Sequence, residues 1–451
     1  YRTNHILVPF GDDFKFKQAA RQFSSMGNVI QAVNSQKNMN VHVRYSTLSE
    51  YFQAVKAEAT QKKINFPVYK LDFFPYADNG DSYWSGYYTT RPTLKAATRT
   101  ADKTLRAVEA AYAMGRAILR ADEYAWEAKF AAVQQLREEA SLVLHHDAIT
   151  GTSRATVVSD YLRRLTQSSA GAMGVAADVW GRLLAKPGSS PPKLTSAQYR
   201  LSFDGTGIPN DGTNGPLDAQ GYPVIVQNPL GWSRNDVVKV ILSDRTSMHT
   251  AQGLVVMDHV GVPVRAQVHT VFHGENMANG ANPSHAFVVH FEVTVPPLGA
   301  RTYYVRRASK AEKLANDGTV AAFVRTKLYV VNTQTGKIES PQAGSRLRGA
   351  TTEGARLEEA VDRPLIFPDE GISIQNGEVR VQFIPRQGLV QSVTRLKDQD
   401  VGTVTAEQEF MYFSSSRSGA YIFRPHGMPK RIQTARHVAV AVADGPLVSQ
   451  V

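Results

Sequence analysis

The 451-residue chain contains no cysteine, which excludes disulfide bonds and thiolate metal sites. It also lacks a usable acceptor for N-glycosylation, because Asn282-Pro283-Ser284 carries a proline at the middle position. No apolar run approaches the roughly 18 residues that a membrane-spanning helix needs. The features that mark disulfide-stapled domains and membrane spans are therefore missing, and we expect no membrane span.

The composition is that of an ordinary globular protein, with 42% hydrophobic and 20% charged residues. A chain of this length is too long to fold around a single hydrophobic core, so we expect roughly two to four domains. The net charge of +11 raises the question of a nucleic-acid partner. Lysine and arginine are scattered rather than gathered in a stripe, and no nucleic-acid motif accompanies them, so we predict no such partner.

The patterning predicts a multidomain α+β protein. Residues 1–92 resemble the tail of an α/β barrel-like domain, with strands at 6–10 and 41–45 and a helix at 46–58. Residues 93–186 read as a three-helix bundle, with helices near 95–119, 122–147 and 153–184 and Thr152 or Ser153 as the N-cap of the third. Apolar residues recur every three or four positions in the second helix, at Trp126, Phe130, Val133, Leu136, Ala140 and Val143.

Proline, glycine and serine then dominate, and residues 187–221 are expected to form a linker. From residue 222 onward, alternating patterns predict strands. We expect a β-sandwich over 222–308 and an incomplete second β-sandwich domain over 309–451, whose open edge would favour aggregation. The histidines on or beside these strands do not assemble a ligand set and are interpreted as ordinary surface or core residues.

The run from His145 to Thr152, His-His-Asp-Ala-Ile-Thr-Gly-Thr, is the most informative candidate site in the sequence. It closes the second helical pattern with three side chains that could bind a metal ion or a sugar. Neighbouring positions on a helix diverge by about 100°, so one histidine is expected to bind while the other packs. A two-histidine pair is weak evidence for a metal, and a purely structural role stays open.

Two other segments carry carboxylates. Gly11-Asp12-Asp13-Phe14 follows the apolar run 6–10, where α/β folds often build their sites, although a helix N-cap pair is the simpler alternative. Residues 72–88 combine Asp72 and Asp78 with many aromatic rings, including Trp84. Rings stack on sugar C–H bonds and acids bind hydroxyls, which suits a sugar site, but a packed loop stays possible.

Together these segments resemble glycoside hydrolase family 38, the retaining α-mannosidases, and most closely its lysosomal-type members. The resemblance covers nearly the whole chain, with the motifs in family order. They are Thr3-Asn4-His5, Gly11-Asp12-Asp13-Phe14, Phe73 to Asp78, Tyr83 to Tyr87, Thr89-Thr90-Arg91-Pro92, His145 to Thr152, Asn228 to Gly231, Pro296 to Gly299 and Ser418 to Phe423. Thr90 departs from the pattern, which more often has serine there.

The resemblance implies roles for seven residues. Asp13 matches the catalytic acid/base, and His146 matches a zinc ligand. Asp147 matches a residue that holds substrate hydroxyls, and Tyr421 matches a tyrosine that reaches the bound sugar. Asp78 and Trp84 lie in a segment that borders the family's site and are expected to contact substrate, and Asp12 is expected either to orient Asp13 or to bind substrate.

Retaining glycosidases need a carboxylate nucleophile beside the acid, and this family also uses zinc to grip the sugar. The resemblance places the nucleophile and the other zinc ligands, a His-x-Asp pair among them, in an upstream catalytic region whose motifs are absent from this sequence. We therefore expect an internal piece of a longer enzyme that acts on mannose-containing glycans, with the upstream region as its partner. Alone, it is expected to bind Zn²⁺ poorly and to be inactive.

Two other functions stay open. One is a non-catalytic carbohydrate-binding or scaffold fragment that uses Trp84, Asp147 and Tyr421. The other is a metal-dependent amidohydrolase built on His145, His146 and Asp147, for which no further histidine cluster exists. The resemblance implies a lysosomal or other secretory-pathway location, and the lack of cysteine and glycosylation acceptors weakens that inference.

Overall fold

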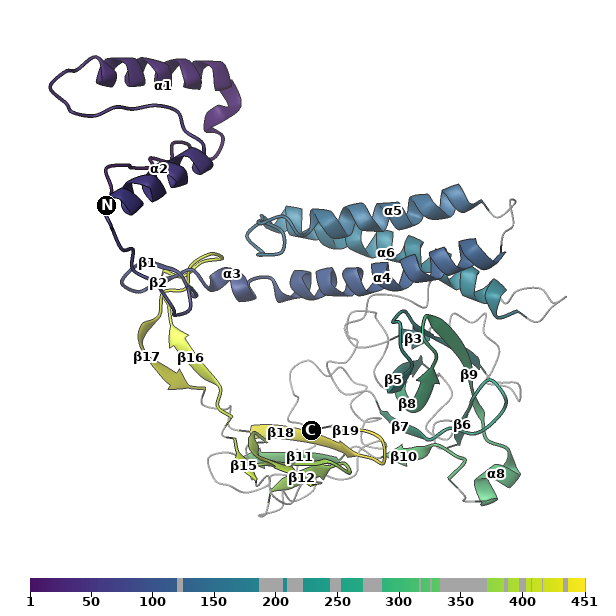
Figure 1. The fold of residues 1–451 in the computed structure, drawn as a ribbon. Coiled ribbons are helices and arrows are strands. Elements are labelled where there is room, and N and C mark those ends of the chain that lie inside the picture. Colours follow the sequence, from purple (N-terminus) through teal and green to yellow (C-terminus); the bar gives the residue numbers. More distant parts are fainter. Residues whose placement is uncertain are drawn as a thin grey trace. The chain divides into compact units, whose positions relative to one another are not determined.

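The computed structural model describes residues 1–119, 125–185, 206–208, 222–243, 253–270, 286–315, 318–324, 327–332, 371–384, 388–396, 403–406, 408–415, 417–432 and 437–450. They form two compact units, Tyr1–Phe74 and Pro75–Val451. Helices and several separate sheets occur together, in agreement with the expected multidomain α+β class (Figure 1). Among the described residues, no helix combines the length and apolarity needed to cross a membrane.

The first unit is helical, with η1 at Lys15–Gln18, α1 at Ala19–Asn34 and α2 at Leu48–Gln61. The helix expected at 46–58 thus forms, and a capping box between Thr47 and Glu50 starts it. The strands expected at 6–10 and 41–45 do not form, and that prediction is wrong. The physical reason is visible at Val43, whose backbone N–H and C=O bond to the Asn34 side-chain amide, both at 2.8 Å, instead of to a neighbouring strand.

Three long helices, α4 at Pro92–Leu119, α5 at Trp126–Leu142 and α6 at Ala155–Leu183, pack around one apolar core (Figure 1). The predicted stripe of the second helix is buried, except at one position. Phe130 is 42% exposed, and its ring packs at the surface beside Tyr112 and the Arg137 guanidinium. The core of these helices is made by the side chains of Leu94, Val108, Trp126, Val133, Leu136, Val143, Leu165, Val179 and Trp180.

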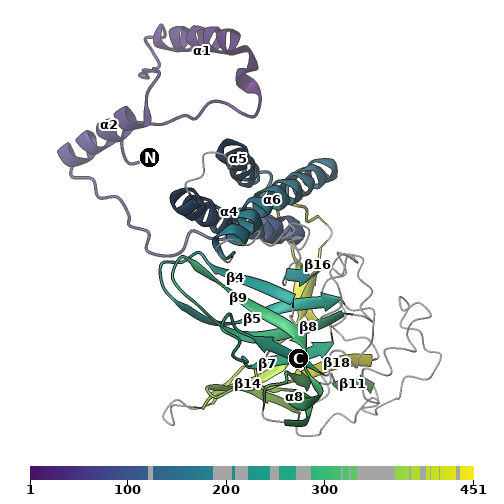
Figure 2. The same ribbon diagram turned by 90° about the vertical axis from the view of Figure 1, so that its right-hand side faces the viewer.

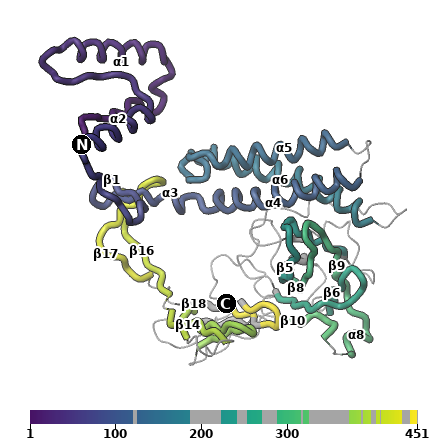
Figure 3. The backbone as a smooth tube through the Cα atoms, in the orientation of Figure 1, coloured from purple at the N-terminus to yellow at the C-terminus, as the bar shows by residue number. Residues whose placement is uncertain are grey.

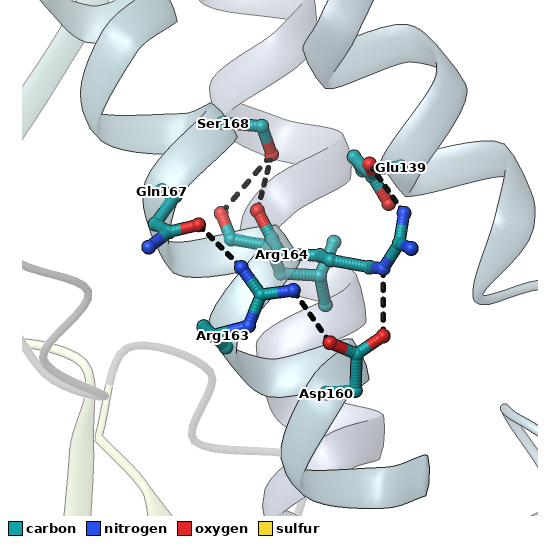
Figure 4. A network of polar contacts seen from close by, with 7 residues as sticks. Glu139, Asp160, Arg163, Arg164, Gln167 and Ser168 are labelled. Atoms are coloured by element: carbon teal, nitrogen blue, oxygen red, sulfur yellow. Dashed lines mark hydrogen bonds and ion pairs between the residues drawn. The ribbon is translucent and has the colours of Figure 1, made fainter.

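Ion pairs join α5 to α6 at the helix surface (Figure 4). The Arg164 guanidinium donates to Glu139 of α5 at 3.0 Å and to Asp160 of its own helix at 2.7 Å. Arg163 adds a second bond to Asp160 at 2.5 Å. These two arginines lower the pKa of the Asp160 carboxyl below its usual range. The Arg164–Glu139 pair links the surfaces of α5 and α6, and exposed pairs of this kind add little stability by themselves.

Strand β3 at 206–208 and the strands between residues 222 and 324 form two sheets that share a core (Figure 2). The first sheet has the order β10-β7-β8-β5-β3 and the second β4-β9-β6. Phe291 of β8 and Tyr303 of β9 meet between them, with ring centroids 5.4 Å apart. The bounds are β3 Thr206–Ile208, β4 Tyr222–Asn228, β5 Arg234–Ser243, β6 Leu254–Met257, β7 Ala266–Thr270, β8 Ala286–Val295, β9 Gly299–Arg307 and β10 Ala322–Val324, and helix α8 spans Lys310–Ala315.

Of the expected linker at 187–221, only Thr206–Ile208 are described, and they form β3, parallel to β5. The rest of that segment lies outside the described residues. Three smaller sheets follow in the last part of the chain, ordered β11-β18-β19, β12-β13-β14-β15 and β16-β17. Their bounds are β11 Lys327–Asn332, β12 Ile372–Gln375, β13 Val379–Phe383, β14 Val390–Arg395, β15 Val404–Thr405, β16 Met411–Ser414, β17 His426–Arg431, β18 His437–Asp444 and β19 Ser449–Gln450.

Candidate functional site

The segment rich in candidate ligands lies in a turn rather than on a helix. Helix α5 ends at Leu142, five residues before the expected end at 147, and irregular turns follow up to α6. His145 and His146 are therefore not constrained by helical geometry. Their ring centroids lie 4.4 Å apart, so the helical divergence of about 100° does not apply to them. The expectation that one histidine binds while the other packs stays a prediction.

The side chains of His145, His146 and Asp147 form a possible metal-binding group. One ligand atom from each lies within 4.8 Å of the others. The Asp147 Oδ2 atom is 3.5 Å from His145 Nε2 and 4.0 Å from His146 Nε2. Donor atoms around a tetrahedral zinc ion are about 3.3 Å apart, given bonds of roughly 2.0 Å, and imidazole and carboxylate are donors that zinc accepts. The donor types fit a metal ion, and small side-chain movements would bring the spacing to that value.

Two hydroxyls donate hydrogen bonds to Asp147. The Thr152 hydroxyl donates to Asp147 Oδ1 at 2.7 Å, and the Ser153 hydroxyl donates to the Asp147 carbonyl at 2.5 Å. These are the two residues expected to cap α6. The N-cap is instead Arg154, without a side-chain cap, because both hydroxyls are engaged by Asp147. The hydrogen bond from Thr152, then the hydrogen bond from Tyr421 and the electrostatic effect of the two histidines, lower the pKa of Asp147 below its ordinary value.

Tyr421 reaches the same carboxylate from a distant part of the sequence. Its hydroxyl donates to Asp147 Oδ1 at 3.2 Å, across 274 residues of chain. The indole of Trp84 lies beside it, with ring centroids 6.4 Å apart. The Trp84 indole N–H is buried and has no hydrogen-bond partner among the residues that the structure describes. Three predicted site residues, Trp84, Asp147 and Tyr421, thus lie together, next to His146.

The loop that contains Tyr421 connects β16 to β17 and is hydrogen-bonded to the segment around Trp84 (Figure 3). Here β1 at Ala77–Asn79 and β2 at Ser82–Tyr83 precede the short helix α3 at Gly86–Thr89. Tyr83 and Phe423 exchange two backbone hydrogen bonds, of 3.1 and 2.8 Å, and the Gly86 N–H donates to the Tyr421 carbonyl at 3.1 Å. A Cβ at Gly86 would approach the Gly419 carbonyl to 2.8 Å, so glycine is required there for this close contact.

The remaining predicted site residues are Asp12, Asp13 and Asp78. Asp12 and Asp13 belong to the first unit, where both are exposed and Asp12 Oδ1 accepts the Asp13 backbone N–H at 2.9 Å. Neither caps a helix, since the N-cap of η1 is Phe14 and has no side-chain cap. The helix-cap alternative is therefore wrong, while the catalytic role of Asp13 stays a prediction. Asp78 is exposed on β1.

The sequence named His145 as a possible ligand, and it joins the possible metal group. It did not predict two contacts that hold the turn: Thr152 was expected only as a helix cap but holds the Asp147 carboxylate, and Lys95 bonds to the backbone of Ile149. The signal for Thr152 was present, because a hydroxyl five residues after an acid in a glycine-containing turn can fold back on it. No sequence signal marks Lys95, which is one of many lysines on a helix.

The sequence matches known domains in three places. Residues 1–79 match the glycosyl hydrolases family 38 N-terminal domain, residues 82–183 the alpha mannosidase middle domain and residues 374–451 the family 38 C-terminal domain. The chain belongs to glycosyl hydrolase family 38. The family assignment made from the motifs is thereby confirmed.

Individual relatives extend the match over the whole chain. It is 30% identical to a Drosophila melanogaster protein named Alpha-mannosidase 2, with 100% of this chain aligned to 39% of that protein. It is 27% identical to a Dictyostelium discoideum protein named Lysosomal alpha-mannosidase, with 94% of this chain aligned to 38% of the relative. A solved alpha-mannosidase structure from Enterococcus faecalis V583 overlaps 93% of this chain and 39% of its own, with 12% identity and a TM-score of 0.43. The chain thus spans about two fifths of the length of these proteins.

Proposed function

We propose that this family 38 chain is part of a retaining, zinc-dependent α-mannosidase that hydrolyses terminal α-linked mannose from glycans. One observation carries the proposal: the Tyr421 hydroxyl meets the Asp147 carboxylate beside His145 and His146, in a chain whose relatives are alpha-mannosidases. A carboxylate, a phenol and an indole around one point are suited to bind sugar hydroxyls and to stack on a sugar ring.

Each side chain has a role in this proposal. His146 holds the zinc ion, for which His145 and Asp147 offer further donors, and the metal when bound supplies a positive charge that binds sugar hydroxyls. Asp147 accepts hydrogen bonds from sugar hydroxyls, which its lowered pKa favours because the carboxylate is ionised. Tyr421 and Trp84 contribute a phenolic hydroxyl and a ring face. Asp13 protonates the leaving oxygen, with Asp12 and Asp78 at the border of the site.

The described chain offers only one cluster of three donors, and all three are consecutive. Retaining glycosidases place two carboxylates about 5–5.5 Å apart, and no motif for the second carboxylate occurs in the sequence. We therefore propose that activity needs the upstream catalytic region of the longer protein, and that the 451-residue chain alone is inactive. A lysosomal or other secretory compartment is proposed from the relative named lysosomal.

The first experiment measures hydrolysis of a chromogenic α-mannoside by the 451-residue chain and by the longer protein, each with added zinc and with a chelator. We expect chelator-sensitive hydrolysis by the longer protein and none by the chain. If the longer protein leaves α-mannosides intact, the α-mannosidase proposal is wrong. Hydrolysis by the chain alone would mean that it contains its own nucleophile.

A second experiment tests the acid/base assignment. In the longer protein, Asp13→Asn should nearly abolish turnover while zinc stays bound, because only the leaving-group proton is removed. The matched control is Asp102→Asn, an exposed acid on α4 that pairs with Arg106 and should leave the rate unchanged. Normal activity of the Asp13 variant would remove this residue from the mechanism.

The alternative function is a carbohydrate-binding or scaffold fragment without catalysis. It is favoured by the aromatic and acidic residues around Tyr421, which need no nucleophile to bind a sugar. Zinc content separates the two proposals, since the scaffold needs no metal and the enzyme does.

A further inference from the structure

The turn that contains His145, His146 and Asp147 rests on the start of α4. Gly151 has a φ of +77°, and a Cβ placed there would overlap the carbonyl oxygen of Thr90 and lie 2.8 Å from the Cβ of Arg91. The Arg91 guanidinium donates to the Ser153 carbonyl at 3.3 Å. The turn is therefore seated directly against residues 90 and 91.

A single ammonium group joins this turn to the segment that holds Tyr421. Lys95, one helical turn after Arg91, donates from Nζ to the Ile149 carbonyl at 2.5 Å and to the Tyr87 carbonyl at 2.7 Å. Ile149 lies two residues after Asp147. Tyr87 follows Gly86, whose N–H bonds to the Tyr421 carbonyl. Lys95 thus touches both pieces of backbone whose side chains meet at the Asp147–Tyr421 hydrogen bond.

The environment of Lys95 differs from that of an ordinary surface lysine. Its side chain is half-buried, and this burial lowers the pKa of the ammonium below its usual range. A buried ammonium is unfavourable unless it donates hydrogen bonds, and the two carbonyls accept them. An apolar side chain at this position would leave both carbonyl oxygens without their donor.

We propose that Lys95 is a positioning residue that sets the distance between the His145–Asp147 turn and the segment that carries Tyr421. Its consequence for catalysis rests on the proposed α-mannosidase function, whereas its effect on the turn does not. Without the ammonium, the turn would lose its hydrogen bond to Lys95 and, through it, to Tyr87. The distance between Asp147 and the Tyr421 hydroxyl would then be held less tightly, by the remaining contacts of Thr90 and Arg91. A misplacement of about 1 Å in such a site can lower the rate roughly 100-fold.

The effect on the turn is tested by hydrogen exchange in the 451-residue chain. The Gly151 and Ser153 amides, which bond to the carbonyls of Ala148 and Asp147, report on the turn. Lys95→Met should speed their exchange by about tenfold, and Lys95→Arg should restore most of the protection because it keeps charge and donors. Lys103→Met, at an exposed lysine of the same helix, is the control and should change nothing.

Unchanged exchange in a folded Lys95→Met chain would overturn the proposal. If that variant does not fold, Lys95→Gln replaces it, because the amide can still donate to one of the two carbonyls. For this variant we expect intermediate protection, and full protection would count against a role for the second bond.

The effect on catalysis is tested in the longer protein with an α-mannoside. We expect Lys95→Met, in folded protein, to raise KM by about tenfold with a smaller change in kcat, because Asp147 and Tyr421 hold the sugar before and during reaction. Lys95→Arg should recover most of the KM, and a wild-type KM in Lys95→Met would refute the proposal. Failure of the wild-type protein to cleave α-mannosides refutes the proposed function instead, and hydrogen exchange then decides the role of Lys95.

Discussion

Replacement of Gly151 by alanine tests whether the site turn is seated on the start of α4. Two costs add at this position. The left-handed φ of +77° disfavours any Cβ by about 1–2 kcal/mol. The new Cβ also overlaps the Thr90 carbonyl, so backbone must shift, and we expect a total loss of about 3–4 kcal/mol of unfolding free energy.

Two control variants separate these costs. Gly427→Ala has a similar φ of +72° but nothing within 4 Å of its Cβ, so it should show the backbone cost alone. Gly171→Ala lies on the exposed face of α6, again with nothing within 4 Å, and should stabilise the helices by up to about 1 kcal/mol.

Urea unfolding supplies the measurement. The fluorescence of Trp126 and Trp180, both in the core of the three helices, follows the body to which Gly151 belongs. A loss for Gly151→Ala that is no larger than about 1–2 kcal/mol, the cost of the backbone conformation alone, would refute the seating of the turn against residues 90 and 91.

Two further predictions concern charged groups. Thr152→Val should raise the pKa of Asp147 toward its ordinary value, as read from NMR of labelled aspartate, and should lower the unfolding free energy by about 1 kcal/mol or less, because water reaches this carboxylate. A lowered pKa stabilises the fold above the unfolded value of 3.8, so this loss should be present at pH 7 and vanish as the pH falls through the folded pKa. Thr166→Val is the control. Glu312→Gln should lower the unfolding free energy by about 2–3 kcal/mol at pH 7, because hydrogen bonds to the Arg306 guanidinium and then to Ser309 lower the pKa of Glu312 to about 2. This stability is complete above pH 4.5 and is lost as the pH falls toward 2, so equal losses at pH 7 and pH 2 would contradict these contacts.

Local patterns predicted the helices well. The period of apolar residues located α4, α5 and α6 to within a few residues of the expected ranges at most ends, since burial on one face produces that period. Helix α5 ended at Leu142, before the histidines and earlier than its apolar pattern predicted. The apolar pattern also did not predict the exposure of Phe130, because a large apolar residue can lie at the edge of a helix stripe and remain partly exposed.

The pattern wrongly predicted strands at 6–10 and 41–45 in the first unit, where none forms. An apolar run becomes a strand only where another strand bonds to it, and the pairing of Val43 with the Asn34 side chain cannot be read from either residue. The candidate site divides in the same way. Family motifs selected Asp147 and Tyr421, whereas the supporting contacts of Thr152 and Lys95 depend on backbone carbonyls and turn geometry that no local pattern encodes.

The bond between Asp147 and Tyr421 also has a consequence for synthesis of the protein. The two residues are 274 positions apart, and a ribosome adds about 5–20 residues per second, so Tyr421 appears roughly 14–55 s after Asp147. Helices α4, α5 and α6 are complete long before that and form their core from their own residues. The turn with its two histidines can thus fold early, and Tyr421 is added last. Folding variants that slow the β16–β17 hairpin should therefore delay completion of the site without slowing formation of the helices.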